Sequence, residues 1–246
     1  MNLFKKIILS IRNYLFPGAC ALCNNSLIYS NEILYNLCRN CRGLIVPIQG
    51  KKCNICGKPL ISENELCVLC RKNENESVMR SYDRLWLLFP YTGKYRKLLT
   101  AYKFKKNLCL AEFFAEKIAE IIRENPVLQD AVIVPVPPRP GKIKNTGWDQ
   151  VDSLVRCLGK HIKNQKVYQC LNRKTSRIQK RLNRNERLEN LKGRIYFKRK
   201  FSKHLQGKPV LLVDDVITTG STLEVCSKVL KESGAVKVYG LCLYFD

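Results

Sequence analysis

VLLVDDVITTGST, residues 210–222, carries the clearest signals for both fold and chemistry in this chain. Four apolar residues predict a buried strand, two adjacent aspartates follow it, and a hydroxyl-rich loop with one glycine leads into a predicted helix. The loop suits a phosphate group, because Gly220 lets the backbone approach closely and a helix N-terminus follows. Asp214 and Asp215 are suited to accept hydrogen bonds from sugar hydroxyls or to hold a hydrated magnesium ion. A triphosphate-binding loop would end in Gly-Lys-Ser/Thr, which is missing, so the stretch favours a sugar monophosphate.

Strands and helices alternate on both sides of this stretch, from residue 82 onwards. Short apolar runs predict buried strands, and an apolar period of 3.6 residues predicts the helices between them. We therefore expect an α/β domain over residues 82–246, with a mostly parallel sheet, helices on both faces and ligands at the carboxyl ends of the strands. The predicted strands are 85–91, 131–137, a weaker one at 166–171, 209–215 and 236–245, and the predicted helices are 108–125, 150–162 and 221–232.

A second group of signals lies near the N-terminus, where eight of the 13 cysteines form four Cys-x-x-Cys pairs within residues 20–70. Successive pairs are separated by 14, 11 and 10 residues, which is typical of a double zinc ribbon with two tetrahedral ions. A redox dithiol and an iron–sulfur cluster are the alternatives. We favour sequential pairing, although spacing alone also allows an interleaved arrangement. The expected ligands are Cys20, Cys23, Cys38 and Cys41 for one ion and Cys53, Cys56, Cys67 and Cys70 for the other.

The parts of the chain around this ribbon are predicted from their composition. Residues 1–19 have the apolar spacing of an amphipathic helix, which we expect to dock on the protein itself; a membrane-surface anchor is the alternative. Residues 71–81 are polar and predict a linker to the α/β domain. Because sulfur would fill all four positions at each zinc ion, we expect the metal to stabilise the fold and not to catalyse.

Charge is the third signal, with 44 Lys and Arg against 20 Asp and Glu and a net charge of +24, which favours an anionic partner. With no export signal and no apolar run that could cross a bilayer, we expect a cytoplasmic protein with reduced thiols. Residues 94–106 hold six Lys and Arg and residues 171–203 hold 13. Aromatic residues among these cations suit single-stranded nucleic acid, unless they pack inward, and the longer stretch could instead close over pyrophosphate. The expected nucleic-acid contacts are Arg177, Arg181, Arg184, Arg187, Lys103 and Lys105.

Residues 210–222 resemble, along their whole length, the 5-phosphoribosyl-1-pyrophosphate (PRPP) signature of type I phosphoribosyltransferases. Further blocks, at 91–115, 134–150 and 175–193, resemble the ComF family, whose members join a zinc ribbon to a phosphoribosyltransferase-like domain. The resemblance implies that both aspartates bind the ribose hydroxyls of PRPP, and that Arg139, with Lys142, meets its pyrophosphate. The residues implied for the 5-phosphate are Thr218, Thr219, Gly220, Ser221 and Thr222.

One block departs from the family pattern. Residues 146–150 read Thr-Gly-Trp-Asp-Gln, where the family usually has Arg-Gly-Phe-Asn-Gln. The arginine is lost and an asparagine is replaced by aspartate, so the task of this loop is not evident from the resemblance.

The resemblance also implies a function. It predicts a ComF-type competence protein that binds single-stranded DNA and PRPP and supports DNA uptake in natural transformation, with a competence helicase and a recombination mediator as partners. The alternative is an active phosphoribosyltransferase that moves ribose 5-phosphate from PRPP to a nitrogenous base. The expected cofactors are two structural Zn²⁺ ions and Mg²⁺ bound with PRPP.

Overall fold

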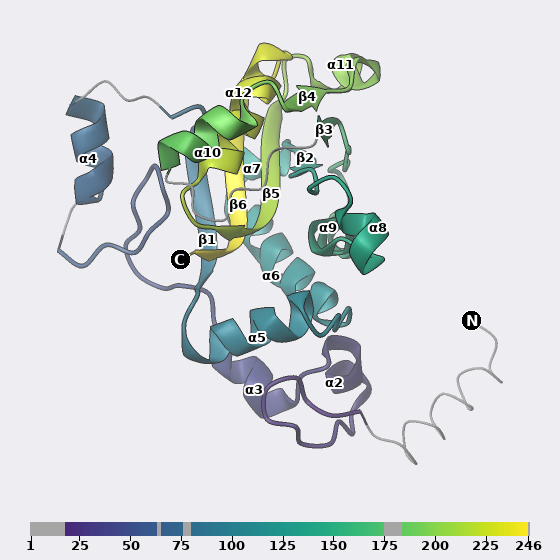
Figure 1. Cartoon of the computed structure of the whole chain (residues 1–246). Helices are drawn as coiled ribbons and strands as arrows, with labels where there is room; N and C mark the ends of the chain where they lie inside the picture. Colours follow the sequence, from purple (N-terminus) through teal and green to yellow (C-terminus); the bar gives the residue numbers. More distant parts are fainter. Residues whose placement is uncertain (1–17, 63–64, 76–79, 175–183, 246) are drawn as a thin grey trace.

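The computed structural model describes residues 18–62, 65–75, 80–174 and 184–245 (Figure 1). The predicted N-terminal helix at 1–19 lies outside the described residues except for its last two positions, and so do Arg177 and Arg181.

The centre of the molecule is a four-stranded sheet in the order β1-β6-β5-β2, in which every neighbouring pair is parallel. This confirms the predicted α/β class with a parallel sheet, and all four of the stronger strand predictions are correct. The middle strand β5 is wholly buried from Val210 to Val213, as expected for a strand covered on both faces. The strands are β1 (Arg84–Pro90), β2 (Val132–Pro135), β5 (Pro209–Ile217) and β6 (Lys237–Phe245).

Helices cover both faces of this sheet (Figure 1). Along β5, Leu211 and Val213 point into one core, which we call the α6-side core, whereas Val210 and Leu212 point into the other, the α12-side core. The two cores alternate because successive side chains of a strand face opposite ways. The α6-side core contains α5 (Gly93–Lys103), α6 (Leu110–Glu124), α7 (Pro126–Gln129) and α9 (Gln150–His161), and the α12-side core contains α10 (Arg184–Leu191) and α12 (Ser221–Glu232).

The weaker strand prediction at 166–171 is mostly wrong. Its only pairing with the sheet is a single parallel bridge between Val167 and Ile133 of β2. The chain then turns away and forms a small two-stranded antiparallel sheet, in which β3 (Leu171–Arg173) pairs with β4 (Ile195–Phe197). Short helices α8 (Lys142–Thr146) and α11 (Ser202–Leu205) and the 3₁₀ turn η1 (Arg199–Phe201) complete this part of the chain.

The cysteine-rich region forms two small lobes that pack on the sheet domain at different places (Figure 1). The first lobe, which carries Cys20 to Cys41, packs against α6. The second lobe, which carries Cys53 to Cys70, lies along β1. Ile48 N donates to Leu88 O at 2.8 Å and Leu85 N donates to Ile55 O at 2.9 Å, so the edge strand is partly paired and protected. The helices of the lobes are α2 (Ser30–Tyr35), α3 (Arg39–Leu44) and α4 (Val68–Asn75).

Two further findings concern this region and the helices in general. Residues 71–75, which we expected in the linker, continue helix α4. None of the helices in the described part of the chain combines the length and apolar character needed to cross a bilayer.

Candidate functional site

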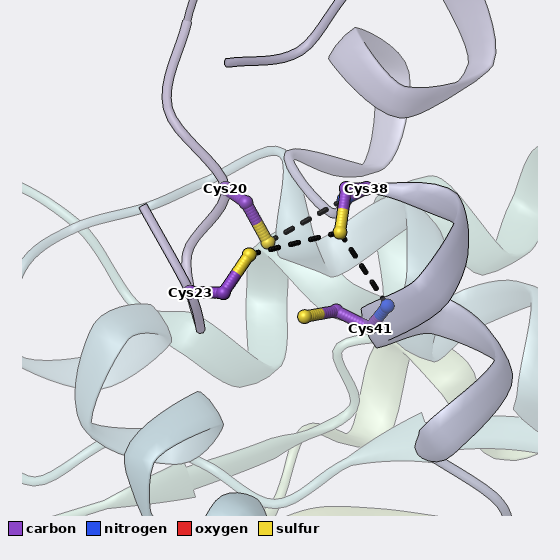
Figure 2. Close-up of side chains that lie close together, drawn as sticks. All are labelled: Cys20, Cys23, Cys38 and Cys41. Atoms are coloured by element: carbon purple, nitrogen blue, oxygen red, sulfur yellow. Dashed lines mark hydrogen bonds between the residues drawn. The ribbon is translucent and has the colours of Figure 1, made fainter. Parts of the chain in front are cut away.

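The eight paired cysteines come together in two groups of four, and the grouping is the sequential one. Within each group all four Sγ atoms lie within 4.8 Å of one another. Figure 2 shows the first group, in which the thiols of two turns converge on one point. The members of the groups are Cys20, Cys23, Cys38 and Cys41, and Cys53, Cys56, Cys67 and Cys70.

The geometry of both groups fits a structural zinc ion. The Sγ atoms of Cys23 and Cys38 are 3.7 Å apart, and those of Cys56 and Cys67 are also 3.7 Å apart. Four Zn–S bonds of about 2.3 Å in a tetrahedron place the sulfurs about 3.8 Å from one another. The donor set and the spacing are therefore consistent with two zinc ions that have no open coordination position.

Backbone amides prepare one cysteine of each group to be a thiolate. Burial acts to raise the pKa of Cys20, but amides of Cys38, Cys23 and Leu22 outweigh it and lower that pKa to about 7. Cys53 holds the same place in the second group, and its pKa is also lowered to about 7, by the amides of Cys56, Cys67 and Ile55 acting against burial. A thiolate is the form of cysteine that binds metal.

The loop after β5 connects the strand directly to helix α12. Gly220 has φ +77°, a left-handed conformation that side-chain-bearing residues rarely adopt, and it is the N-cap of α12. The hydroxyls of Thr219 and Ser221 lie 3.0 Å apart, so the polar groups of the loop converge just before the helix. The predicted loop and the predicted helix at 221–232 are both present.

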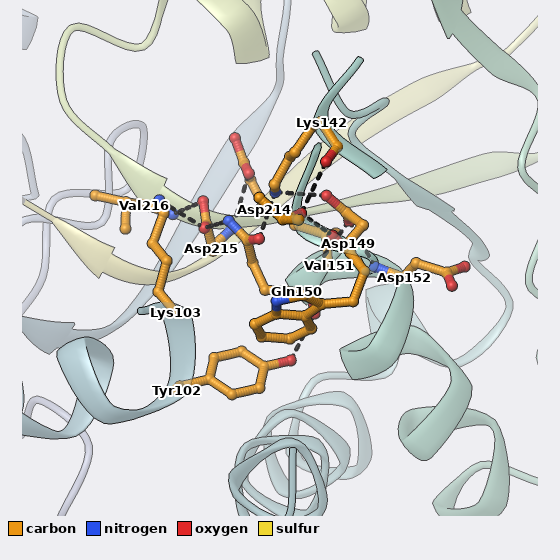
Figure 3. A network of polar contacts seen from close by, with 12 residues as sticks. Tyr102, Lys103, Lys142, Asp149, Gln150, Val151, Asp152, Asp214, Asp215 and Val216 are labelled. Carbon is orange, nitrogen blue, oxygen red and sulfur yellow. Dashed lines mark hydrogen bonds and ion pairs between the residues drawn. The ribbon is translucent and has the colours of Figure 1, made fainter. Parts of the chain in front are cut away.

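The carboxylate pair sits near the end of β5, where Figure 3 shows its contacts. Asp215 forms an ion pair with Lys103 of α5, in which Nζ lies 2.9 Å from Oδ2. It also accepts a hydrogen bond from the side-chain amide of Gln150 of α9. Burial acts to raise the pKa of Asp215, but the charge of Lys103, the hydrogen bonds from Gln150 and Lys103 and the charge of Lys142 together outweigh it, so the pKa is lowered. Burial and the charge of Asp215 together raise the pKa of Asp214 well above its ordinary value. The two neighbouring carboxyl groups are therefore in different electrostatic environments.

The departure from the family pattern at residues 146–150 has a local explanation in this network. Trp148 packs edge-on against Tyr102, with ring centroids 5.5 Å apart. Asp149 caps helix α9 by accepting from two backbone amides, and it also pairs with Lys142 at 2.5 Å. Gln150 binds Asp215. This block thus supports Asp215 from the α9 side, through Gln150.

Lys142, which we expected to be available for an anion, is engaged in this network. It donates to the side chains of both Asp149 and Gln150. The neighbouring cations Arg139 and Lys144 instead line a cavity of about 240 Å³ after β2, together with Arg173 of β3. The sequence prediction included Arg139 but missed Arg173, which is one of many cations in its stretch and has no motif around it.

Arg173 stands out in this cavity because its Nε atom is buried and has no hydrogen-bond partner among the described residues. Burial, followed by the charge of Arg139, lowers its pKa. Two guanidinium groups beside a proline-rich turn form a cationic pocket suited to an anion.

A second cavity, of about 180 Å³, lies between the loop after β5 and the second cysteine group. Its lining includes Thr218, Thr219 and Gly220 from the loop, and Lys58 and Arg80 from the cysteine-rich side. The loop therefore adjoins the second cysteine-rich lobe, which the sequence did not reveal because the two segments are far apart in the chain.

Comparison with known proteins agrees with this architecture. The family model described as a double zinc ribbon domain matches residues 11–71, which include all eight paired cysteines. Competence protein ComFC of Streptococcus pneumoniae is 28% identical over 233 residues, which cover 90% of this chain and 98% of that protein. Competence protein F of Haemophilus influenzae is 28% identical over 234 residues, covering 92% of this chain and 97% of that protein.

The chain is a homologue of the ComF competence proteins. Among solved structures, purine phosphoribosyltransferase from Pyrococcus horikoshii aligns with 56% of this chain and 81% of its own, at 25% identity and a TM-score of 0.32.

In this ComF homologue, the basic segment at 94–106 divides between core and surface. Tyr102 is fully buried, and Tyr95 stacks on Phe89 with centroids 5.5 Å apart, so both pack inward. Phe104 is 69% exposed, and Lys105 beside it is exposed as well. Lys103, which we expected on the nucleic-acid surface, is instead paired with Asp215.

The structure does not test the remaining predicted nucleic-acid contacts. Arg184 and Arg187 lie on helix α10, whose backbone is described although these two side chains are not. Arg177 and Arg181 fall in the undescribed segment before that helix.

Proposed function

We propose that this chain binds magnesium PRPP at the carboxyl edge of its sheet and single-stranded DNA on an adjoining basic surface, and that it serves DNA uptake. The names of its homologues support a role in competence. The helicase and the recombination mediator implied by the ComF resemblance are part of this proposal.

The observation that carries the ligand proposal is the order of polar features along one edge of the sheet. The loop after β5 comes first, Asp214 follows, and the cationic cavity after β2 lies beyond it. Val136 N donates to Val213 O at 2.9 Å, which ties the start of the cavity loop to the strand next to Asp214. PRPP has the same order of groups, a phosphate, a ribose and a pyrophosphate, and its magnesium ion would share the charge of the carboxylates.

The DNA proposal is supported by the end of helix α5. Phe104 is mostly exposed, and Lys105 and Lys106 next to it are exposed, so a base could stack while the ammonium groups meet the phosphates. This surface begins one residue after Lys103, which is part of the carboxylate site. The two proposed ligands would therefore bind at neighbouring positions.

Calorimetric titration with magnesium PRPP, ribose 5-phosphate and pyrophosphate tests the proposed PRPP binding. We expect Arg139→Gln to weaken PRPP binding about tenfold and to leave ribose 5-phosphate nearly unaffected, because only PRPP would reach the cationic cavity. Arg123→Gln, at an exposed position on α6, is the control. Absence of binding heat with magnesium PRPP in the wild type would refute the ligand proposal.

Fluorescence anisotropy with a short single-stranded DNA tests the proposed DNA binding. We expect Phe104→Ala to weaken binding about tenfold through loss of stacking, and Lys105→Glu with Lys106→Glu to weaken it further and to reduce its salt dependence. The matched control is Lys163→Glu with Lys208→Glu, two exposed lysines outside the basic segment at 94–106. Equal losses in both double variants would show that only net charge matters.

A further inference from the structure

The two adjacent aspartates of β5 leave the strand toward opposite faces of the sheet, although their carboxyl groups approach each other near its end. Side chains alternate along the strand, so Asp215 follows Leu211 and Val213 toward the α6-side core, where α5 and α9 lie. Asp214 follows Val210 and Leu212 toward the other face. In agreement with this, the charge of Asp214 acts on Arg173 of β3 and on Cys226 of α12.

The oxygens of Asp215 are already occupied by protein groups. Oδ2 accepts from Lys103 Nζ at 2.9 Å and from the side-chain amide of Gln150, and Oδ1 accepts from the backbone amide of Val216 at 2.8 Å. The residue is 7% exposed. The main chain of Gln150 is held as well, because Tyr102 donates its hydroxyl to the Gln150 carbonyl at 2.5 Å. One carboxylate thus ties α5, α9 and β5 together (Figure 3).

Asp214 is less engaged. Its Oδ1 atom accepts from the backbone amide of Asp215 at 2.8 Å, and the residue is partly exposed. On its face of the sheet lies the cationic cavity lined by Arg139 and Arg173. Within the described residues, no ion pair involves this carboxyl group.

We propose that the carboxylate pair has two separate tasks: Asp214 contacts the sugar of the ligand, whereas Asp215 is a positioning residue that Lys103 and Gln150 hold in place. This inference rests on the proposed function for the role of Asp214. It assigns Lys103 to the sugar-phosphate site and removes it from the DNA surface. The same ion pair fixes the end of α5, from which Phe104 and Lys105 project.

A set of isosteric variants separates the two tasks, each assayed by thermal unfolding and by calorimetric titration with magnesium PRPP well below the unfolding temperature. We expect Asp214→Asn to weaken PRPP binding at least tenfold with little change in Tm. Lys103→Met should lower Tm by at least about 5 °C, because it leaves the buried Asp215 carboxylate without its cation. Asp130→Asn, an exposed carboxylate, is the control for the amide substitution.

The double variant Lys103→Met with Asp215→Asn sharpens the test. It should recover most of the Tm lost in Lys103→Met, because the uncompensated buried charge is gone. Lys103→Arg should keep PRPP affinity within threefold of the wild type, whereas Lys103→Met should weaken it about tenfold by releasing Asp215; a merely structural lysine would leave affinity unchanged at the lower temperature.

Two results would overturn the inference. One is that Asp215→Asn weakens PRPP binding as much as Asp214→Asn with an unchanged Tm, which would mean that both carboxylates contact the sugar. The other is a Tm unaffected by Lys103→Met. If the wild type binds no magnesium PRPP, the proposed function fails, and with it the ligand role of Asp214, while the Tm cycle still decides whether Lys103 positions Asp215.

Discussion

The two cysteine groups share ligand type and are each built from two Cys-x-x-Cys pairs, yet they are built into the molecule in different ways. The first group belongs to the main core: Cys20 and Cys41 lie in the same buried cluster as Phe113 and Phe114 of α6. Tyr35 of that lobe packs edge-on against Phe113, with centroids 6.2 Å apart, and donates its hydroxyl to Glu116.

The second group forms a small core of its own. Cys53, Cys56 and Cys70 form a separate buried cluster with a few partly buried neighbours, of which Ile55 also packs against the α12-side core. Its contacts with the sheet domain include the backbone pairing along β1 and the cavity beside the loop after β5. The same metal chemistry should therefore stabilise the whole domain in one place and a local surface next to the loop after β5 in the other.

The largest expected effect comes from removing one zinc ligand in each lobe. Cys20→Ala and Cys53→Ala are matched, because both residues are buried and each is the first cysteine of its group. Each variant should hold about one zinc ion per chain instead of about two. We expect Cys20→Ala to lower Tm by roughly 10 °C or more, since it disturbs the main core, and Cys53→Ala to lower it by less than half as much.

Elemental analysis measures the zinc content, and calorimetric unfolding measures Tm. Hydrogen exchange locates the region that Cys53→Ala destabilises. In Cys53→Ala the amide of Leu85, which donates to Ile55 O, should exchange much faster than in the wild type. Equal Tm shifts in the two variants would contradict the comparison.

An intermediate effect is expected at the contact between the second lobe and β1. Gly57 has φ +68°, and a Cβ there would lie 2.3 Å from the backbone oxygen of Leu85. We expect Gly57→Ala to destabilise the lobe by about 2–3 kcal/mol, because the lobe must move away from the strand. Gly50→Ala is the control: its φ is +83°, but nothing lies within 4 Å of the added Cβ, so only backbone strain of about 1 kcal/mol is expected.

Hydrogen exchange of the β1 amides and thermal unfolding distinguish the two glycine variants. A similar loss of stability in both would show that the close approach to Leu85 is unimportant.

The smallest effect concerns the contact between the first lobe and α6. Burial, with the hydrogen bond and charge of Glu116, raises the pKa of Tyr35 to about 12 from an ordinary value of 10.0. Because the folded-state pKa is raised, this contribution to stability is fully present below about pH 10 and is lost as the pH rises through about 12. Tyr35→Phe should cost about 1–2 kcal/mol at neutral pH.

Unfolding temperatures of the wild type and of Tyr35→Phe, followed between pH 9 and about 12, check this sign. The wild type should lose more stability than the variant over the upper part of this range, so that the two curves converge. Parallel curves would mean that Tyr35 does not titrate with folding.

The strands, the helix at 221–232 and the cysteine groups could be predicted because their signals are local. A buried strand needs only a run such as 210–213, and a Cys-x-x-Cys turn brings two thiols together whatever the rest of the chain does. Residues 166–171 show the limit of this reasoning. Their short apolar run predicts a strand, but the segment makes only one bridge to the sheet.

The sequence by itself determined which residues bear the chemistry: eight thiols at metal spacing, two aspartates at a strand end and a glycine before a helix. Only the tertiary structure decided which of these residues come together in space and with which partners. Lys103, Gln150 and Asp215 meet from three distant segments. Arg173 turns into a cavity formed by another loop, and the second cysteine-rich lobe adjoins the loop after β5. Local patterns specify periods and turns, whereas charge pairing and shared burial depend on which segments the packed sheet brings side by side.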